Sequence, residues 1–202
     1  MLQSIRLVLP NAIREKGTTM TVNVEFRSLA PSDEQIRELE KRFFRYPKAQ
    51  RKEFARMKNL KPATPENISQ LKEEVGELPV DYIDFLMTQN GGRPEPSICR
   101  SIDGKKYVVN KLFALSYGLK FQSSITNYMN VYRDRIPGQS LPIGNSPGGD
   151  VYLLDLRKDE FGSILYWRHE LESNGIGTHY YGNIKKVANS FSDFLNQFIE
   201  MT

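Results

Sequence analysis

A few residues close together in the sequence have side chains that could perform catalysis or bind a metal ion. Trp167, His169 and Glu170 lie in "WRHE", and Asp150 ends the segment "GNSPGGD". Histidine and carboxylate groups serve as general acids and bases and as zinc ligands. Zinc usually takes at least three protein ligands, so a metal site here would need the distant His179 or other residues brought in by the fold. We therefore predict no metal site, and keep an enzyme using His169, Glu170 and Asp150 as an alternative.

The glycine-rich segment "GNSPGGD", residues 144–150, has two interpretations. Backbone N–H groups in such loops can bind phosphate. However, the segment lacks the Lys-Ser/Thr pair of a P-loop and precedes an expected strand rather than a helix. The pattern favours a turn that places Asp150 at the start of that strand.

Cysteine content and motif content both argue against an enzyme. Cys99 is the only cysteine, which excludes an internal disulfide and a thiolate zinc cage. No motif places a histidine beside it, so we expect Cys99 to be buried and inert. The sequence contains no nucleophile elbow, dinucleotide fingerprint or metal-binding histidine pair. The sequence therefore contains no recognisable enzyme motif, and no cofactor is expected.

Charge is distributed unevenly along the 202 residues, whose net charge is +4. Residues 1–60 contain 13 Lys or Arg and 7 Asp or Glu, whereas residues 61–202 have a net charge of −2. The near-neutral remainder argues against a basic nucleic-acid-binding domain. The basic segment is a solvated surface or a surface for nucleic acid or an acidic partner, and the first interpretation is favoured.

The N-terminal residues do not resemble a targeting signal. The apolar patch at Leu7–Leu9 ends at Pro10, and no apolar run approaches the roughly 20 residues needed to cross a bilayer. These features predict a cytoplasmic protein without membrane contact. Translation could start at Met1 or at Met20, which precedes the alternating strand pattern of residues 20–29.

Local patterns predict several helices and strands. Ser32 and Gln35 form a capping box for a helix over residues 31–46, with Ile36, Leu39 and Phe43 on an apolar face. The other elements expected are helices over 64–75, 79–88, 123–136 and 187–201, strands over 106–115, 151–156 and 163–168, and an edge strand at 178–182.

The segment "LPVDYIDFLMTQNGG", residues 78–92, combines an apolar helix with a strong stop signal. Tyr82, Phe85 and Leu86 share one helix face. Asn90, Gly91 and Gly92 tolerate positive φ angles, so the helix should end and the chain reverse there. A domain boundary is expected near Lys61, which divides the chain into a basic N-terminal extension (1–60) and a main domain (61–202).

Three passages resemble the SUKH superfamily, which includes the fungal Smi/Knr cell-wall regulators and many bacterial immunity proteins. They are "ISQLKEEVGELPVDYIDFLMTQNGG", "LPIGNSPGGDVYLLDLRKDEFGSILYWRHE" and "VANSFSDFLNQFI". In this order they span residues 64–199. The resemblance implies an α+β fold with an antiparallel-rich sheet and helices packed against it, and it implies no catalysis. Its motif positions suggest the following cleft or binding residues: Asn90, Gly91, Gly92, Asp150, Trp167, His169 and Glu170.

Two functions from different classes follow from this resemblance. The first is an immunity protein that binds a cognate protein toxin, for which a nuclease is one option, and blocks its active site. An acidic toxin surface would complement the basic extension. The second is a regulatory scaffold of the Smi/Knr type that recruits protein partners through residues 1–60. Neither function requires a cofactor, nucleic acid or membrane, and the oligomeric state is left open.

Overall fold

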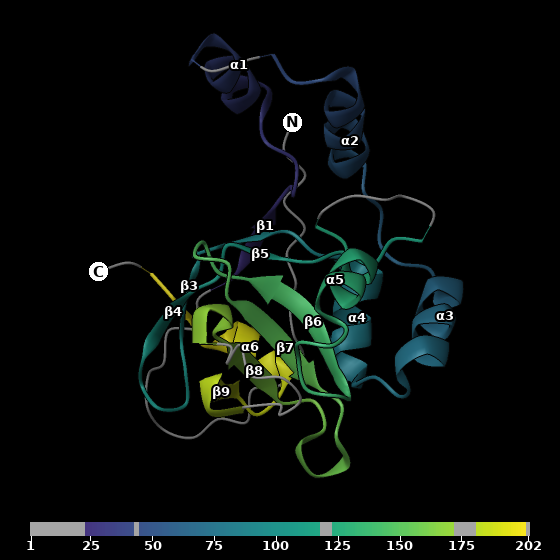
Figure 1. Ribbon diagram of the computed structural model, residues 1–202, viewed down its shortest axis with the longest axis vertical. Helices are drawn as coiled ribbons and strands as arrows, with labels where there is room; N and C mark the ends of the chain where they lie inside the picture. Colours follow the sequence, from purple (N-terminus) through teal and green to yellow (C-terminus); the bar gives the residue numbers. More distant parts are fainter. Residues whose placement is uncertain (1–22, 43–44, 118–122, 172–180, 201–202) are drawn as a thin grey trace.

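A computed structural model describes residues 23–42, 45–117, 123–171 and 181–200 (Figure 1). Within these ranges the chain forms three antiparallel sheets and six α-helices. The predicted α+β fold is therefore confirmed. His179, Phe43, Met20 and most of the edge strand expected at 178–182 lie outside the described residues.

The largest sheet has the strand order β5-β6-β7-β8-β9. Its strands are β5 (Lys111–Leu112), β6 (Ser140–Asn145), β7 (Val151–Asp155), β8 (Ile164–Trp167) and β9 (Ile184–Ala188). β7 and β8 form the predicted hairpin, in which Tyr152 pairs with Tyr166 and Val151 with Trp167. Because side chains alternate along a strand, Tyr152 and Tyr166 join the main core while Val151 and Trp167 form a second cluster. Both faces of the hairpin are thus buried.

Two smaller sheets lie beside it. One pairs β1 (Glu25–Arg27) with β2 (Arg93–Glu95), and the other has the order β10 (Phe198–Ile199), β3 (Ile98–Arg100), β4 (Lys106–Val108). In β1 the ring of Phe26 packs against Phe85 at a centroid distance of 5.3 Å. The extension is therefore joined to the main domain through β1, and the boundary near Lys61 stays a prediction.

The α-helices are α1 (Asp33–Arg42), α2 (Lys48–Lys58), α3 (Pro65–Val75), α4 (Val80–Thr88), α5 (Ile125–Tyr132) and α6 (Phe191–Asn196). Short 3-10 turns are η1 (Lys158–Glu160), η2 (His169–Leu171) and η3 (Tyr181–Asn183). Figure 1 shows α3, α4 and α5 beside the five-stranded sheet, and α1 and α2 at one end of the molecule. Among the residues described, none of the helices is both long and apolar enough to cross a bilayer.

The helices of the main domain follow the predicted patterns. Thr64 caps α3 by accepting a hydrogen bond from the backbone N–H of Asn67, whose side chain bonds back to Thr64. α4 buries the predicted face, and its Tyr82 and Phe85 pack against Phe191 of α6 at centroid distances of 5.0 and 4.9 Å. This aromatic contact joins two helices that are about a hundred residues apart in sequence.

The first predicted helix is only partly correct. Its capping box is present, because Ser32 and Gln35 exchange backbone-to-side-chain hydrogen bonds of 2.8 and 3.1 Å. The apolar face is not buried in α1, since none of its residues is buried and Leu39 is exposed. Instead, α1 lies against α2 through ion pairs, Asp33 with Lys58 and Glu40 with Arg51.

Two further predictions need correction. Residues 187–201 do not form one helix, because Val187 and Ala188 belong to β9 and residues 198–199 to β10. Ser190 accepts a hydrogen bond from the N–H of Asp193 and so starts the helix at Phe191. The strand expected over 106–115 is split into β4 and β5, which belong to different sheets.

Candidate functional site

Asn90 occupies a buried position at the end of α4. Its φ angle is +55°, as the stop signal predicted. The side-chain amide donates to the carbonyl oxygens of Lys61 (2.8 Å) and Leu115 (3.0 Å), and its oxygen accepts from the N–H of Leu115 (2.8 Å). All these bonds join separate segments of the fold. Asn90 therefore ties the start of the main domain to the residues after β5.

Gly91 and Gly92 allow other backbone segments to approach closely. A Cβ atom on Gly91 would lie 2.9 Å from the backbone nitrogen of Ala114, and one on Gly92 would lie 3.0 Å from Cβ of Phe26. Both have positive φ angles. The Asn-Gly-Gly motif is thus a packing junction between β1, α4 and the segment after β5.

Asp150 and His169 form a hydrogen-bonded cluster at the ends of β7 and β8. One carboxylate oxygen of Asp150 lies 2.9 Å from Nδ1 of His169 and accepts from its backbone N–H at 3.1 Å. The other oxygen accepts from the hydroxyl of Tyr166 at 2.7 Å. Gly149 lies under the imidazole, because a Cβ there would be 3.1 Å from Cε1 of His169. The cluster fixes the turn "GNSPGGD" against β8.

Trp167 and Glu170 differ in their surroundings. Trp167 is buried and packs edge-on against Tyr132 at 5.3 Å, while the guanidinium of Arg135 lies 5.2 and 5.4 Å from the two ring centroids. Glu170 lies exposed in η2. The structure therefore gathers Asp150, Trp167 and His169 in one place, and it places Asn90 to Gly92 in another. Partner binding by these seven residues stays a prediction.

The remaining candidate chemistry is limited. Cys99 is buried, as predicted, and burial raises the pKa of its thiol to about 12, so it is protonated at neutral pH. Within the ranges that the structure describes, no three His, Cys, Asp or Glu residues lie close enough to hold a metal ion.

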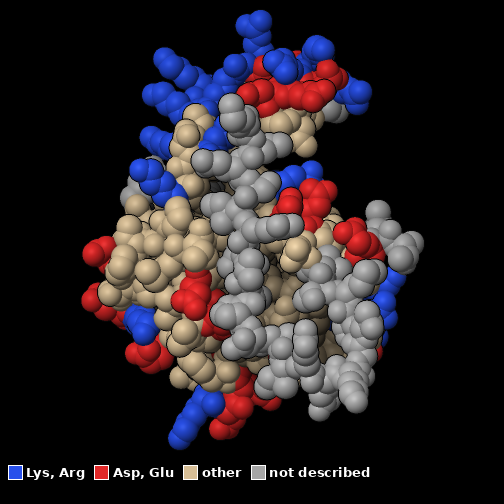
Figure 2. Space-filling model, turned by 180° about the vertical axis from the view of Figure 1, so that it is seen from behind, with Lys and Arg blue, Asp and Glu red and all other residues tan. Residues whose placement is uncertain are grey.

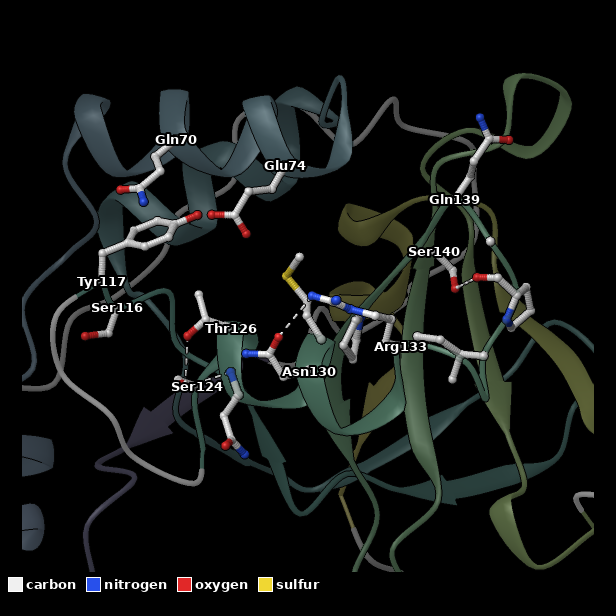
Figure 3. A pocket seen from close by; sticks show the side chains of 16 residues that line it. Gln70, Glu74, Ser116, Tyr117, Ser124, Thr126, Asn130, Arg133, Gln139 and Ser140 are labelled. Carbon is white, nitrogen blue, oxygen red and sulfur yellow. Dashed lines mark hydrogen bonds between the residues drawn. The ribbon is translucent and has the colours of Figure 1, made fainter.

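A cavity of about 850 Å³ opens between α3 and α5 (Figure 3). α3 contributes Gln70 and Glu74, and Tyr117 lies beside them from the segment after β5. α5 and the residue that follows it contribute Asn130 and Arg133, and the far end is formed by residues 136–142. Figure 3 shows the side chains of Glu74 and Arg133 extending toward the space from opposite sides. We call this cavity the α3–α5 groove.

The arrangement of these motifs matches a known family. A model of the SMI1 / KNR4 family (SUKH-1) matches residues 62–197. The chain belongs to this family. It is also 28% identical over 155 residues to the SPbeta prophage-derived uncharacterized protein YokK of Bacillus subtilis (strain 168). The alignment covers 68% of this chain and 75% of YokK. The predicted resemblance is confirmed, and membership indicates an immunity-like or Smi1/Knr4-type function.

The matched span of this SUKH-1 protein includes the α3–α5 groove but begins after α2. None of the seven residues predicted from the motifs is among those that line the groove. Its lining residues come from α3, α5 and two loops, so no single motif brings them together in the sequence. The only local signal was the run of acidic residues Glu73 and Glu74 beside the buried stripe of α3.

Outside the matched span, this SUKH-1 protein has a basic surface. In Figure 2, Lys and Arg side chains gather at the end of the molecule formed by α1 and α2. Within residues 45–58, four basic residues are exposed and have no ion pair with another described residue: Arg45, Lys48, Lys52 and Arg56. We call them the α2 basic surface. Exposed positive charge attracts acidic partners and accelerates their association with the protein.

Proposed function

We propose that this protein is a non-enzymatic immunity protein, which binds a cognate bacterial toxin domain and blocks its action in the cytoplasm. The observation on which the proposal rests is the SUKH-1 family match over residues 62–197.

Several of the motif residues use their side chains within the fold. Asn90 spends its side chain on three hydrogen bonds within the fold, and both oxygens of Asp150 are occupied by Tyr166 and His169. Uncommitted polar and charged groups lie instead in the α3–α5 groove and on the α2 basic surface. Either could contribute to an interface of about 800 Å² per partner.

The test is co-expression with the product of the adjacent gene. We expect that this product alone arrests growth, that the protein restores growth, and that the two co-purify as a stable complex. The His169→Ala variant serves as a control for the enzyme alternative, because a binding protein should lose only some stability or affinity. Failure of both rescue and co-purification, with a neighbour that is harmless alone, would exclude the immunity function.

A regulatory scaffold of the Smi/Knr type is the second candidate, and the α2 basic surface favours it. Deleting residues 1–60 is a poor test, since β1 and Phe26 pack against the main domain. Replacing Lys48, Lys52 and Arg56 together by Glu leaves β1 in place and reverses the charge. Partner binding that is lost in this triple variant, and kept when the groove is altered, would favour the scaffold.

A further inference from the structure

The α3–α5 groove has a buried hydroxyl in its lining, that of Tyr117. Burial raises the pKa of Tyr117, and the adjacent Glu74 carboxylate, toward which the hydroxyl can donate, raises it further, so the phenol is neutral. No hydrogen bond of full geometry to this hydroxyl is formed with the described residues, and its oxygen keeps its lone pairs free. This oxygen can accept a hydrogen bond from a ligand in the groove.

Glu74 provides negative charge beside this hydroxyl. In Figure 3 its carboxylate and the Gln70 amide, one helical turn away, both lie near the Tyr117 hydroxyl. Glu74 is exposed and forms no ion pair within the described part of the chain. The neighbouring Lys72 is already paired with Glu77 at 2.7 Å. The α3 side of the groove is therefore a group of hydrogen-bond acceptors whose charge is not neutralised.

The α5 side has the opposite character. Arg133 is exposed, and its guanidinium donates to the side-chain oxygen of Asn130 at 3.4 Å. Remaining donors of Arg133 and Asn130 can bind carbonyl or carboxylate oxygens. A ligand in the groove would therefore present a cation to α3 and oxygen atoms to α5.

We propose that the α3–α5 groove binds an arginine or lysine side chain on a loop of the partner protein, with Glu74 and Tyr117 as acceptors and Arg133 facing the loop's carbonyl oxygens. This inference rests on the proposed immunity function for the identity of the partner. A guanidinium fits best, because its planar donors match a carboxylate and can lie on the Tyr117 ring. The cavity of about 850 Å³ lies within the range of about 300–1,000 Å³ typical of ligand pockets, which leaves room for flanking peptide. Positively charged loops are a property of toxins that act on nucleic acid.

The first test uses the full chain and two peptides, acetyl-Gly-Arg-Gly-amide and the same peptide with neutral citrulline in place of arginine. In an NMR titration we expect the arginine peptide to shift the amide signals of Gln70, Glu74 and Asn130 at millimolar concentration. The citrulline peptide should bind at least tenfold more weakly. Equal shifts from the two peptides, or none from either, would overturn the inference.

Variants show whether the groove itself binds the cation. Glu74→Gln should weaken the arginine peptide about tenfold, and Tyr117→Phe severalfold. Asp84→Asn is the control, because it removes one negative charge from an exposed position of α4 outside the groove and breaks no ion pair with a described residue, so it should leave peptide binding unchanged. Tyr117→Phe should fold normally, since it keeps the aromatic ring and removes only the hydroxyl. An unchanged affinity in Glu74→Gln would contradict the proposed site.

Growth rescue separates this inference from the proposed function. If wild type and Asp84→Asn rescue growth and the double variant Glu74→Gln/Tyr117→Phe does not, both proposals are supported. Undiminished rescue and toxin affinity in the double variant would overturn the groove as the docking site and leave the immunity function standing. Binding of the arginine peptide without any rescue by wild type would retain the cation site and exclude the toxin as its partner.

Discussion

Two consecutive helices of equal length, α2 and α3, are opposite in charge and in burial. α2 contains five Lys or Arg and one Glu, and it buries only Met57. α3 contains three Glu and one Lys, and it buries Ile68 and Leu71 in the main core. α3 lies within the SUKH-1 match and α2 lies outside it.

The difference shows that one set of residues determines the fold of this molecule and another set presents charge to a partner. Apolar burial places α3, and only its remaining polar face lines the groove. α2 adds a charged surface that is attached through β1 and through a small apolar cluster of Met57 with Leu29, Ala30 and Ala114. Its ion pairs with α1 are worth about 0–1 kcal/mol each. Stability should therefore depend on the main domain, while changes on α2 should alter recognition with little effect on folding.

The largest expected effect is at Asn90. Asn90→Ala removes three hydrogen bonds and leaves buried partners unsatisfied, so we expect a loss of about 3–4 kcal/mol in the free energy of unfolding. Asn59→Ala, at the exposed end of α2, removes one surface bond and should cost about 0.5 kcal/mol or less. Urea denaturation measures both. Equal losses would remove the contrast between the two regions.

Gly91 and Gly76 separate backbone strain from steric overlap within the main domain. Both have positive φ angles, but only Gly91 has backbone atoms near the position of an added Cβ. We expect Gly91→Ala to cost about 3 kcal/mol and Gly76→Ala about 1 kcal/mol, measured by thermal denaturation. A Gly91→Ala variant as stable as Gly76→Ala would mean that the segment around Ala114 moves easily.

Stability should fall in alkali, because the core of the main domain buries acidic protons. Burial raises the pKa values of Cys99 and Tyr82, so both stay neutral when folded and ionise first in the unfolded chain. The stability that these neutral groups contribute is complete below pH 8.5, which is about the pKa of a thiol in the unfolded chain. For Cys99 it is lost as the pH rises from there toward the folded pKa of about 12. Cys99 alone should account for on the order of 2 kcal/mol at pH 10.

Denaturation curves from pH 7 to 10.5 test this prediction, with Cys99→Ala as the comparison. The variant starts less stable but should lose less stability per pH unit above pH 9. Parallel curves for the two proteins would show that the thiol does not contribute.

The smallest effect is expected where α1 meets α2. A double-mutant cycle on Glu40 and Arg51 should give a coupling energy below about 1 kcal/mol that decreases with added salt. A larger, salt-independent value would mean that α1 and α2 form a rigid part of the fold, so that α2 would differ less from α3 than its burial indicates.

Sequence patterns predicted the parts of this fold that depend on local chemistry. Thr64 as a cap, Asn90 as a stop and the β7–β8 hairpin are set by neighbours within a few residues, and all are present. The last helix was overextended, because the apolar spacing around Phe198 is the same in a helix and in a strand that pairs with β3.

The candidate site was predicted less well for a similar reason. Motif residues such as Asn90 and Asp150 are recognisable because the fold needs them, and their side chains are used within it. Glu74, Tyr117 and Arg133 meet only through tertiary packing, and no short segment contains them together. Sequence reasoning therefore located residues that maintain the architecture and missed the groove.

The pairing of β1 with β2 also constrains how the chain can be synthesised. On the order of 70 residues separate Glu25 from its partner Glu95, so β1 has no strand to join until all of α1 to α4 has left the ribosome. Helices α1 and α2 therefore emerge attached to an unpaired strand. Because β2 is the next strand along the chain, β1 can pair with it before β9 emerges to complete the five-stranded sheet.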